Sequence, residues 1–462
     1  MSENPTKAVL DFPKNFLWGT ATAAHQVEGN NQLNDWWAFE QEPGRIHDGT
    51  TSGNACQHYQ LYQSDIALMQ RLHQNAYRFS LEWSRIEPEE GRFDAKTIAH
   101  YRAVLEELHA YGIEPVVTIH HFTNPLWLVA KGGWETSAVV RYFERFTRLV
   151  AREYGDLVRY WVTINEPMVY AVLGYMLSAW PPAKRRPELG FACVANMMRA
   201  HAAAYRILHE TTKLAPLVGI AHNMRIFDPA NAGRWLDRKV AALQDYIFNE
   251  TVLIALTEGR LHLPLGMDEV PGGRDSLDFI GLNYYSRDLV AFDIRQPRMF
   301  FGNNFPSPEA ELSLFGWEIY AEGIYRFCKR LASYRRPILI TENGLPDETD
   351  EQRPRVLLDH LVALHRAIME GVNVHGYFHW SLIDNFEWAE GYRTPFGLVA
   401  VDFQTQVRTV KSSGELYAEI CRQSAITPQM HASVKGRAAE PKKHLNLYGE
   451  KYYANSNAIA GN

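Results

Sequence analysis

Eight short segments rich in β-branched and aromatic residues recur along the 462-residue chain, and few folds can accommodate such a repeat. Most of the segments are separated by longer stretches with the 3.6-residue period of an amphipathic helix. Near-continuous apolar runs indicate strands that are buried on both faces, as in a parallel sheet covered by helices. The segments are FLWGTA from Phe16, AYRFSLEW from Ala76, EPVVTIHHF from Glu114, VRYWVTIN from Val158, LVGIAHN from Leu217, LDFIGLNYY from Leu277, PILITEN from Pro337 and VHGYFHWSLID from Val374.

The sustained alternation of strand and helix predicts an α/β fold, a single (β/α)₈ TIM barrel with its active site at the C-terminal ends of the strands. We expect the barrel to form one domain over residues 1–426. The alternative is an open doubly wound sheet, which should carry a glycine-rich phosphate turn after an early strand. The chain contains neither GxGxxG nor GxxxxGK[ST], so the barrel is favoured.

The composition is that of an ordinary soluble globular protein, with 46% hydrophobic residues, 22% charged residues and a formal net charge of -6. This charge gives no reason to expect nucleic acid or an anionic membrane as a partner. The four cysteines are far apart in the sequence, which is typical of reduced thiols in a cytoplasmic protein. The N-terminus lacks the apolar stretch of a signal peptide, and no segment approaches about 18 uninterrupted apolar residues, so neither export nor a membrane span is expected.

Residues 427–462 are polar, slightly basic and without a helical or strand period. Such a segment predicts a flexible C-terminal extension. A docking role for its small cluster LNLYGEKYY stays open, because short apolar clusters in tails sometimes dock. The sequence also leaves the oligomeric state open, a homo-oligomer included.

Two glutamates stand out because each interrupts a buried run at the end of its strand, Glu166 on the fourth strand and Glu342 on the seventh. Alone, either residue could be hydrated or could cap a helix. As a pair facing each other across a barrel mouth they supply what glycoside cleavage requires. One carboxylic acid protonates the leaving oxygen, and one carboxylate attacks or supports the anomeric carbon.

Seven motifs resemble those of glycoside hydrolase family 1, the β-glucosidase family, in order and in spacing. The resemblance covers the chain from Phe12 to about Arg422. The motifs are FLWGTATAAHQVEG, YRFSLEWSRI, TINEP, GLNYYSR, GWEIYAEGIY, ITENG and HWSLIDNFEWAEGYRTPFGLVAVD. The resemblance implies a β-glycosidase that needs neither a metal nor a cofactor and acts on a small-molecule β-glycoside.

The resemblance assigns the catalytic roles residue by residue. Glu342 matches the nucleophile and Glu166 the acid/base, while Arg78 and Tyr285 match the groups that keep the nucleophile ionised. Such enzymes retain the anomeric configuration, so the two carboxyl groups should lie roughly 5 Å apart. The charge on Glu342 should raise the pKa of Glu166 until formation of a glycosyl ester removes that charge.

Six further residues match the family's sugar site. The resemblance implies that polar side chains hold the sugar hydroxyls and that two tryptophans form a floor and a wall. The polar residues are Gln26, His121, Asn165 and Glu387, and the tryptophans are Trp380 and Trp388. The His120-His121 pair is not expected to bind a metal, because adjacent residues on a strand point to opposite faces.

The aglycone site is the part that the resemblance defines least. Many family members carry an aromatic residue directly after NEP, whereas this chain has Met168, whose flexible side chain suggests a tolerant site. Trp317 either lines the aglycone entrance or packs in the core. Pro167 disfavours the α conformation at the residue before it, so we expect Glu166 to be extended.

The expected substrate is a terminal, non-reducing β-D-glucoside of an oligosaccharide or of an aryl or alkyl alcohol, with β-D-fucosides and β-D-galactosides also accepted. The sequence does not rank these sugars, and it leaves open the balance between hydrolysis and transglycosylation. A 6-phospho-β-glycosidase is the first alternative, but anionic Glu387 would repel a sugar phosphate. A barrel that only binds glycans is the second, and the presence of both glutamates argues against it.

Overall fold

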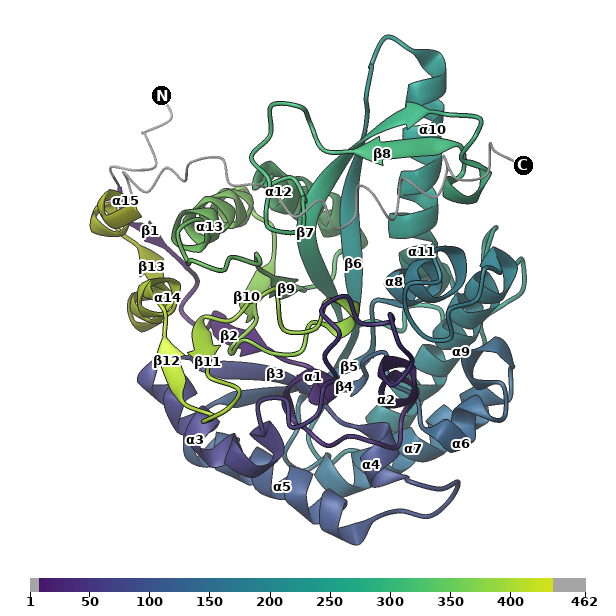
Figure 1. Ribbon diagram of the computed structural model, residues 1–462, viewed down its shortest axis with the longest axis vertical. Helices are drawn as coiled ribbons and strands as arrows, with labels where there is room; N and C mark the ends of the chain where they lie inside the picture. The colour runs from purple at the N-terminus through teal and green to yellow at the C-terminus, as the bar shows by residue number, and fades with distance from the viewer. Residues whose placement is uncertain (1–7, 435–462) are drawn as a thin grey trace.

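The computed structural model describes residues 8–434, and all eight predicted segments form strands that close into a parallel barrel (Figure 1). The strands neighbour one another in the order β6-β5-β4-β3-β2-β10-β9-β7, and pairing of β6 with β7 closes the ring. The predicted (β/α)₈ barrel is therefore confirmed. The barrel strands are β2 (Leu17–Ala21), β3 (Ala76–Ser80), β4 (Glu114–His120), β5 (Tyr160–Asn165), β6 (Leu217–Pro229), β7 (Phe279–Phe292), β9 (Ile338–Asn343) and β10 (Val374–Trp380).

Helices on the return path of each strand cover the barrel from outside (Figure 1). In α7 the residues Val139, Phe143, Phe146 and Val150 are buried, because their spacing places them on the one face that packs on the core. The long outer helices are α3 (His58–Arg71), α5 (Ala95–Ala110), α7 (Val139–Tyr154), α9 (Pro187–Thr211), α11 (Thr251–Glu258), α12 (Glu322–Leu331), α13 (Arg353–Met369) and α14 (Ser412–Gln423).

Short helices fill the loops that follow the strands. Two of them, η2 and η3, are π-helical, a geometry that often marks functional sites. The short helices are α1 (Ala24–Val27), α2 (Asp35–Glu40), α4 (Trp83–Ile86), α6 (Leu126–Val129), η1 (Gly133–Glu135), α8 (Pro167–Ala171), η2 (Val172–Met176), η3 (Tyr246–Glu250), η4 (Pro297–Met299), η5 (Ala332–Tyr334) and η6 (Trp388–Glu390).

Strands β6 and β7 continue beyond the barrel and stay paired as far as Pro229 and Val290. The end of β7 also pairs in antiparallel register with β8 (Gly302–Phe305), and α10 (Trp235–Asp245) packs on this β extension. The extension stands above the barrel in Figure 1. A small separate sheet of β11 (Val399–Val401) and β12 (Arg408–Val410) follows the eighth barrel strand.

The two ends of the described chain meet where β1 (Leu10–Asp11) pairs with β13 (Ala425–Ile426). The segment predicted to be a flexible extension from Thr427 begins instead with a helix, α15 (Pro428–Val434). Its Met430 and Val434 are buried and the helix packs against α13, which explains why it is ordered here. The rest of that segment, including the cluster LNLYGEKYY, lies outside the described residues.

All four cysteines are unpaired and buried, in keeping with the predicted reduced thiols. Within residues 8–434, none of the helices combines the length and the apolar composition that crossing a bilayer would need.

Candidate active site

A cavity of about 750 Å³ opens at the C-terminal ends of the barrel strands and contains most of the predicted site. Gln26 and Arg78 do not line it, and both are buried directly behind residues that do. The predicted residues on its wall are His121, Asn165, Glu166, Met168, Tyr285, Trp317, Glu342, Trp380, Glu387 and Trp388.

Glu342, at the end of β9, is bonded to a cation and to a hydroxyl group. The guanidinium of Arg78 contacts Glu342 Oε1 at 2.6 Å, and the Tyr285 hydroxyl donates to Oε2 at 2.7 Å. Burial raises the pKa of the Glu342 carboxyl, and Arg78 and Tyr285 oppose that rise. Both contacts favour the ionised form, so this carboxyl group is the one suited to carry a negative charge.

Glu166, directly after β5, accepts hydrogen bonds from uncharged amide groups instead. Its Oε1 accepts hydrogen bonds from Asn283 Nδ2 at 2.7 Å and from Asn223 Nδ2 at 3.0 Å. Burial, and then the negative charge of Glu342, raise the pKa of Glu166 to about 8. The unequal environments therefore favour the proton on Glu166 and the negative charge on Glu342, which is the division that acid and nucleophile need.

Strand register brings these groups to one level of the barrel. Asn223 on β6 is paired with Asn283 on β7, and Asn283 with Glu342 on β9. The Thr341 hydroxyl donates to Asn283 Oδ1 at 2.6 Å, so the amide nitrogen faces Glu166. Neither asparagine was predicted as a site residue, although each ends the apolar run of its strand, which is the signal that could have identified it.

The backbone of Glu166 is left-handed, with φ +46° and ψ +61°, so the extended conformation expected from Pro167 is wrong. Glu166 precedes α8, and its N–H donates to the carbonyl of Ala221 at 2.8 Å while its carbonyl accepts from Tyr170 N–H at 3.1 Å. These two bonds select a left-handed turn. Phe122 and Trp388 on the same cavity wall also have positive φ, and such residues cost on the order of 1–3 kcal/mol each.

The buried Gln26 is hydrogen-bonded to the half-buried Glu387. Gln26 Nε2 donates to Glu387 Oε2 at 3.1 Å and to Asn385 Oδ1 at 3.0 Å. Gln26 Oε1 is buried without a hydrogen-bond partner in the protein. Burial raises the pKa of Glu387 to about 8, with the charge of Glu342 adding to it. An acceptor left open in this way is suited to a ligand hydroxyl.

Asn165 links the catalytic and polar groups. Arg78 donates to Asn165 Oδ1 at 2.6 Å, and Asn165 Nδ2 lies 3.1 Å from His121 Nε2. Burial lowers the pKa of His121 well below its usual value, so the ring is neutral, and its Nδ1 is buried without a partner. The ring stacks on Trp380 and Trp388, with centroids 5.8 and 6.1 Å away.

His120 points to the other face of β4, where its Nε2 lies 3.1 Å from Asn124 Oδ1 and 3.2 Å from Trp134 Nε1. The two histidines are thus not paired, as their adjacency on the strand predicts. In the part of the chain that the structure describes, no three His, Cys, Asp or Glu side chains are grouped as a metal site.

Met168 and Trp317, the candidate aglycone residues, both line the cavity. Met168 is buried in α8, two residues after Glu166. Trp317 is half-buried, and its ring lies 5.6 Å from Tyr285 and 4.8 Å from Phe315. Trp317 thus lies on the cavity wall and also packs against the hydrophobic core.

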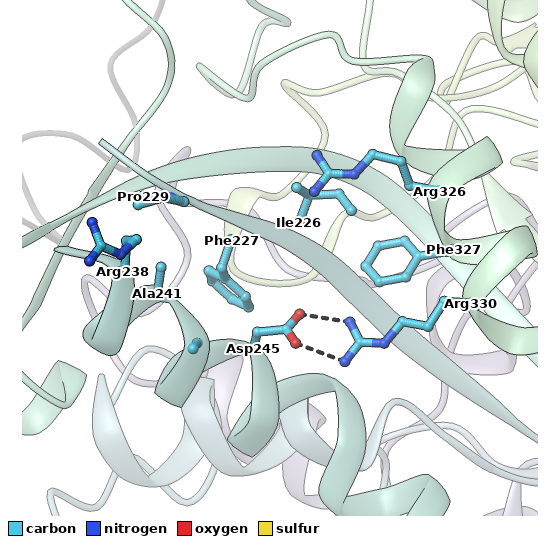
Figure 2. Close-up of a pocket in the computed structure, with 10 residues that line it drawn as sticks. Ile226, Phe227, Pro229, Arg238, Ala241, Asp245, Arg326, Phe327 and Arg330 are labelled. Atoms are coloured by element: carbon cyan, nitrogen blue, oxygen red, sulfur yellow. Dashed lines mark hydrogen bonds and ion pairs between the residues drawn. The ribbon is translucent and has the colours of Figure 1, made fainter. Parts of the chain in front are cut away.

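A second pocket, of about 390 Å³, lies between β6, α10 and α12 (Figure 2). Two of its three arginines are paired with carboxylates: Arg330 contacts Asp245 at 2.9 and 2.7 Å, and Arg326 contacts Asp228 at 2.8 Å through both nitrogens. Among the described residues, Asp245 is the one carboxylate residue that lines this pocket, so the pocket offers no pair of carboxyl groups with different pKa values. Phe227 lines this pocket and the larger cavity, so it separates the two.

Replacement of Glu166 by glutamine should stabilise the protein at alkaline pH. The folded-state pKa of Glu166 is raised from 4.5 to about 8, so its stabilising contribution is complete below pH 4.5 and is lost as the pH rises to about 8. Glutamine stays neutral and keeps an acceptor for both asparagines. We expect the free energy of unfolding at pH about 8 to rise by about 1–3 kcal/mol, with less gain at pH about 5.

Denaturant titrations at the two pH values check this expectation. Glu309→Gln, the same substitution at an exposed glutamate, is the matched control and should change stability little at either pH. An equal effect of Glu166→Gln at both pH values would contradict the raised pKa of Glu166.

Comparison with known proteins agrees with this geometry. Residues 9–426 match the family model described as glycosyl hydrolase family 1. β-Glucosidase A from Thermotoga maritima is 36% identical over 446 residues, which cover 90% of this chain and 99% of that protein. A β-glycosidase from Pyrococcus horikoshii has 40% identity and a TM-score of 0.87, covering 92% of this chain and 98% of its own. The Thermotoga maritima β-glucosidase in complex with galacto-hydroximolactam has 35% identity and a TM-score of 0.85, covering 90% and 100%.

Proposed function

Because the chain belongs to glycosyl hydrolase family 1, a membership that confirms the resemblance seen in the sequence, we propose that it releases terminal β-D-glucosyl residues with retention of configuration. It is a hydrolase of the β-glucosidase type. The unequal environments of the two glutamates are the main support for the mechanism. Glu342 has a cation and a hydroxyl donor, and Glu166 has two amides and a raised pKa.

In the first step, a carboxylate oxygen of Glu342 attacks the anomeric carbon while the bond from that carbon to the leaving oxygen breaks. Glu166 gives its proton to the leaving oxygen, so the aglycone departs as a neutral alcohol. The sugar is then held as an ester of Glu342. Arg78 and Tyr285 stabilise the carboxylate before attack and orient its two oxygens.

In the second step, the ester no longer carries the charge that raised the pKa of Glu166. The pKa of Glu166 falls, the residue stays ionised, and it takes a proton from an attacking water. Water adds to the anomeric carbon, the ester bond breaks, and Glu342 regains its charge. Two inversions at one carbon restore the β configuration.

We assign the sugar hydroxyls to groups whose hydrogen-bonding capacity is open. The unpartnered Oε1 of Gln26 and the carboxyl group of Glu387 would hold two neighbouring hydroxyls. Asn165 lies beside Glu166 and is the proposed partner of the 2-hydroxyl, and His121 donates from its neutral ring. Trp380 and Trp388 would pack on the C–H faces of the ring.

β-D-Fucosides and β-D-galactosides are included in the proposal. The galacto-configured ligand of the relative from Thermotoga maritima supports this breadth. Transglycosylation would follow the same chemistry, with a sugar hydroxyl in place of water in the second step. A 6-phosphosugar is disfavoured, because the cavity lining that the structure describes contains no lysine and its one arginine, Arg225, is already paired with Asp288.

A panel of 4-nitrophenyl β-glycosides tests the proposal: glucoside, galactoside, fucoside, xyloside and mannoside. We expect the glucoside, galactoside and fucoside to be hydrolysed, and the mannoside at least about tenfold more slowly, since its axial 2-hydroxyl misses Asn165. NMR during the first turnovers should show β-glucose before mutarotation. If α-glucose appeared first, the enzyme would be inverting and Glu342 could not be the nucleophile.

A further inference from the structure

Beyond the catalytic residues, the active-site cavity continues into a space lined mainly by apolar side chains. We call this space the apolar chamber and define it by Val169, Val172, Leu173, Leu177, Phe248 and Phe305. All six are half-buried. They come from the segments that follow β5, β6 and β7, so the chamber lies between α8–η2, η3 and the β extension.

One wall of the chamber starts at the proton donor. Val169 lies three residues after Glu166 in α8, and Leu173 and Leu177 follow it at four-residue spacing in η2 and at its C-terminal end; all three line the cavity. These three side chains form one stripe of the chamber wall. The oxygen that Glu166 protonates belongs to the leaving group, so the leaving group is the part of the substrate that extends along the stripe.

Most polar groups of the chamber already bind one another. Arg225 is paired with Asp288 at 2.9 Å. Gln244 and Asn304 exchange two hydrogen bonds of 2.9 Å, and Asn304 also donates to Asp288 at 3.2 Å. A second sugar placed here would therefore meet few free partners for its hydroxyl groups.

An unpaired hydroxyl buried at an apolar wall is costly, whereas an aliphatic chain gains from each methylene that it buries. The Ser286 hydroxyl donates to a backbone carbonyl at 3.0 Å, so a sugar would depend mainly on the half-buried Gln296 and Asn303. Met168 and Met299 add flexible side chains that adapt to ligands of different shape.

We propose that the preferred aglycone is an aliphatic chain of medium length, such as an alkyl or isoprenoid alcohol, and not a second sugar. This inference rests on the proposed function, because it assigns the leaving group of that same reaction. The continuity of the chamber with Glu166 and the mutual pairing of its polar groups favour this occupant over a cello-oligosaccharide.

A chain-length series of alkyl β-D-glucosides, from methyl to octyl, tests the inference. We expect kcat/KM to rise about two- to fourfold for each added methylene until the stripe is covered. Cellobiose should react at least about tenfold more slowly than octyl glucoside. A flat series, or cellobiose preferred over octyl glucoside, would overturn the inference while hydrolysis of 4-nitrophenyl β-glucoside still supported the proposed function.

Binding can be measured without turnover. Octyl β-thioglucoside, titrated calorimetrically, should bind at least about tenfold more tightly than methyl β-thioglucoside. Equal affinities would contradict the chamber even if the enzyme hydrolysed none of the glycosides tested. If octyl β-thioglucoside bound more tightly than methyl β-thioglucoside but no glycoside were hydrolysed, the result would count against the proposed function alone.

Leu173→Gln and Phe248→Gln test the chamber directly, because each puts a polar side chain into its apolar wall. Each should lower kcat/KM for octyl glucoside at least about tenfold and leave methyl glucoside within about twofold. Leu243→Gln on the outer face of α10, where Leu243 is 41% exposed, is the matched control and should change neither. An equal loss for octyl and methyl glucosides in both chamber variants would show a general defect and refute an aglycone site there.

Discussion

Glu342→Gly should abolish turnover, with kcat for 4-nitrophenyl β-glucoside reduced on the order of 10⁴–10⁶-fold, because the proposed nucleophile is lost. No other carboxylate of the site is bonded to Arg78 and Tyr285 together, among the residues that the structure describes. Azide should restore activity, because it can occupy the space that the side chain leaves. It attacks once, from the side opposite the leaving group, and gives α-glucosyl azide, which NMR identifies.

Glu166→Ala with azide is the matched comparison for that experiment. Glu342 then still forms the ester, and azide attacks the ester, so the product is β-glucosyl azide with retained configuration. The two variants should thus give opposite anomers from one substrate. If Glu342→Gly gave the retained product, its assignment as nucleophile would be wrong.

Glu166→Ala should slow substrates in proportion to how much help their leaving groups need. For alkyl glucosides the loss of the proton donor should cost about 10²–10⁴-fold in kcat/KM. For 2,4-dinitrophenyl glucoside, whose leaving group departs without a proton, the loss of kcat/KM should be small. Equal losses for both substrates would remove Glu166 as the acid.

The pH profile supplies an independent check on Glu166. The reactive form is protonated, and the pKa of Glu166 is raised to about 8, so kcat/KM of the unmodified enzyme for alkyl glucosides should fall above pH about 8. In Glu166→Ala that decline should disappear. An alkaline decline of kcat/KM that persisted in the variant would have to belong to another group, such as Glu387.

The barrel was predictable because its signal is local. Each of the eight buried runs carries its strand-forming residues within itself, and polar residues mark the strand ends where the loops begin. The pair of Glu166 and Glu342 followed from the same logic. Both residues line one cavity at the end that a barrel uses for chemistry.

The features that were missed depend on contacts between distant segments. The left-handed turn at Glu166 is set by a hydrogen bond to Ala221 on the next strand. Asn223 became a site residue only through its register with Asn283. The ends of β6 and β7 alternate between buried and half-buried residues, because only one face of this extension is covered, so they lack the continuous apolar run that marked the barrel strands.

Phe227 belongs to the β extension and not to the ring of strands that carries the glutamates, yet it forms the partition between the two pockets. The extent of the active-site cavity on this side is therefore limited by a part of the protein that has no role in the proposed bond breaking. Substitution of Phe227 should therefore alter which alcohols the site accepts as leaving groups without changing the protonation states of Glu166 and Glu342. The fold thus separates the residues proposed for bond breaking, which stand at the ends of barrel strands, from those proposed to select the leaving group, so the second set can be changed without altering the first.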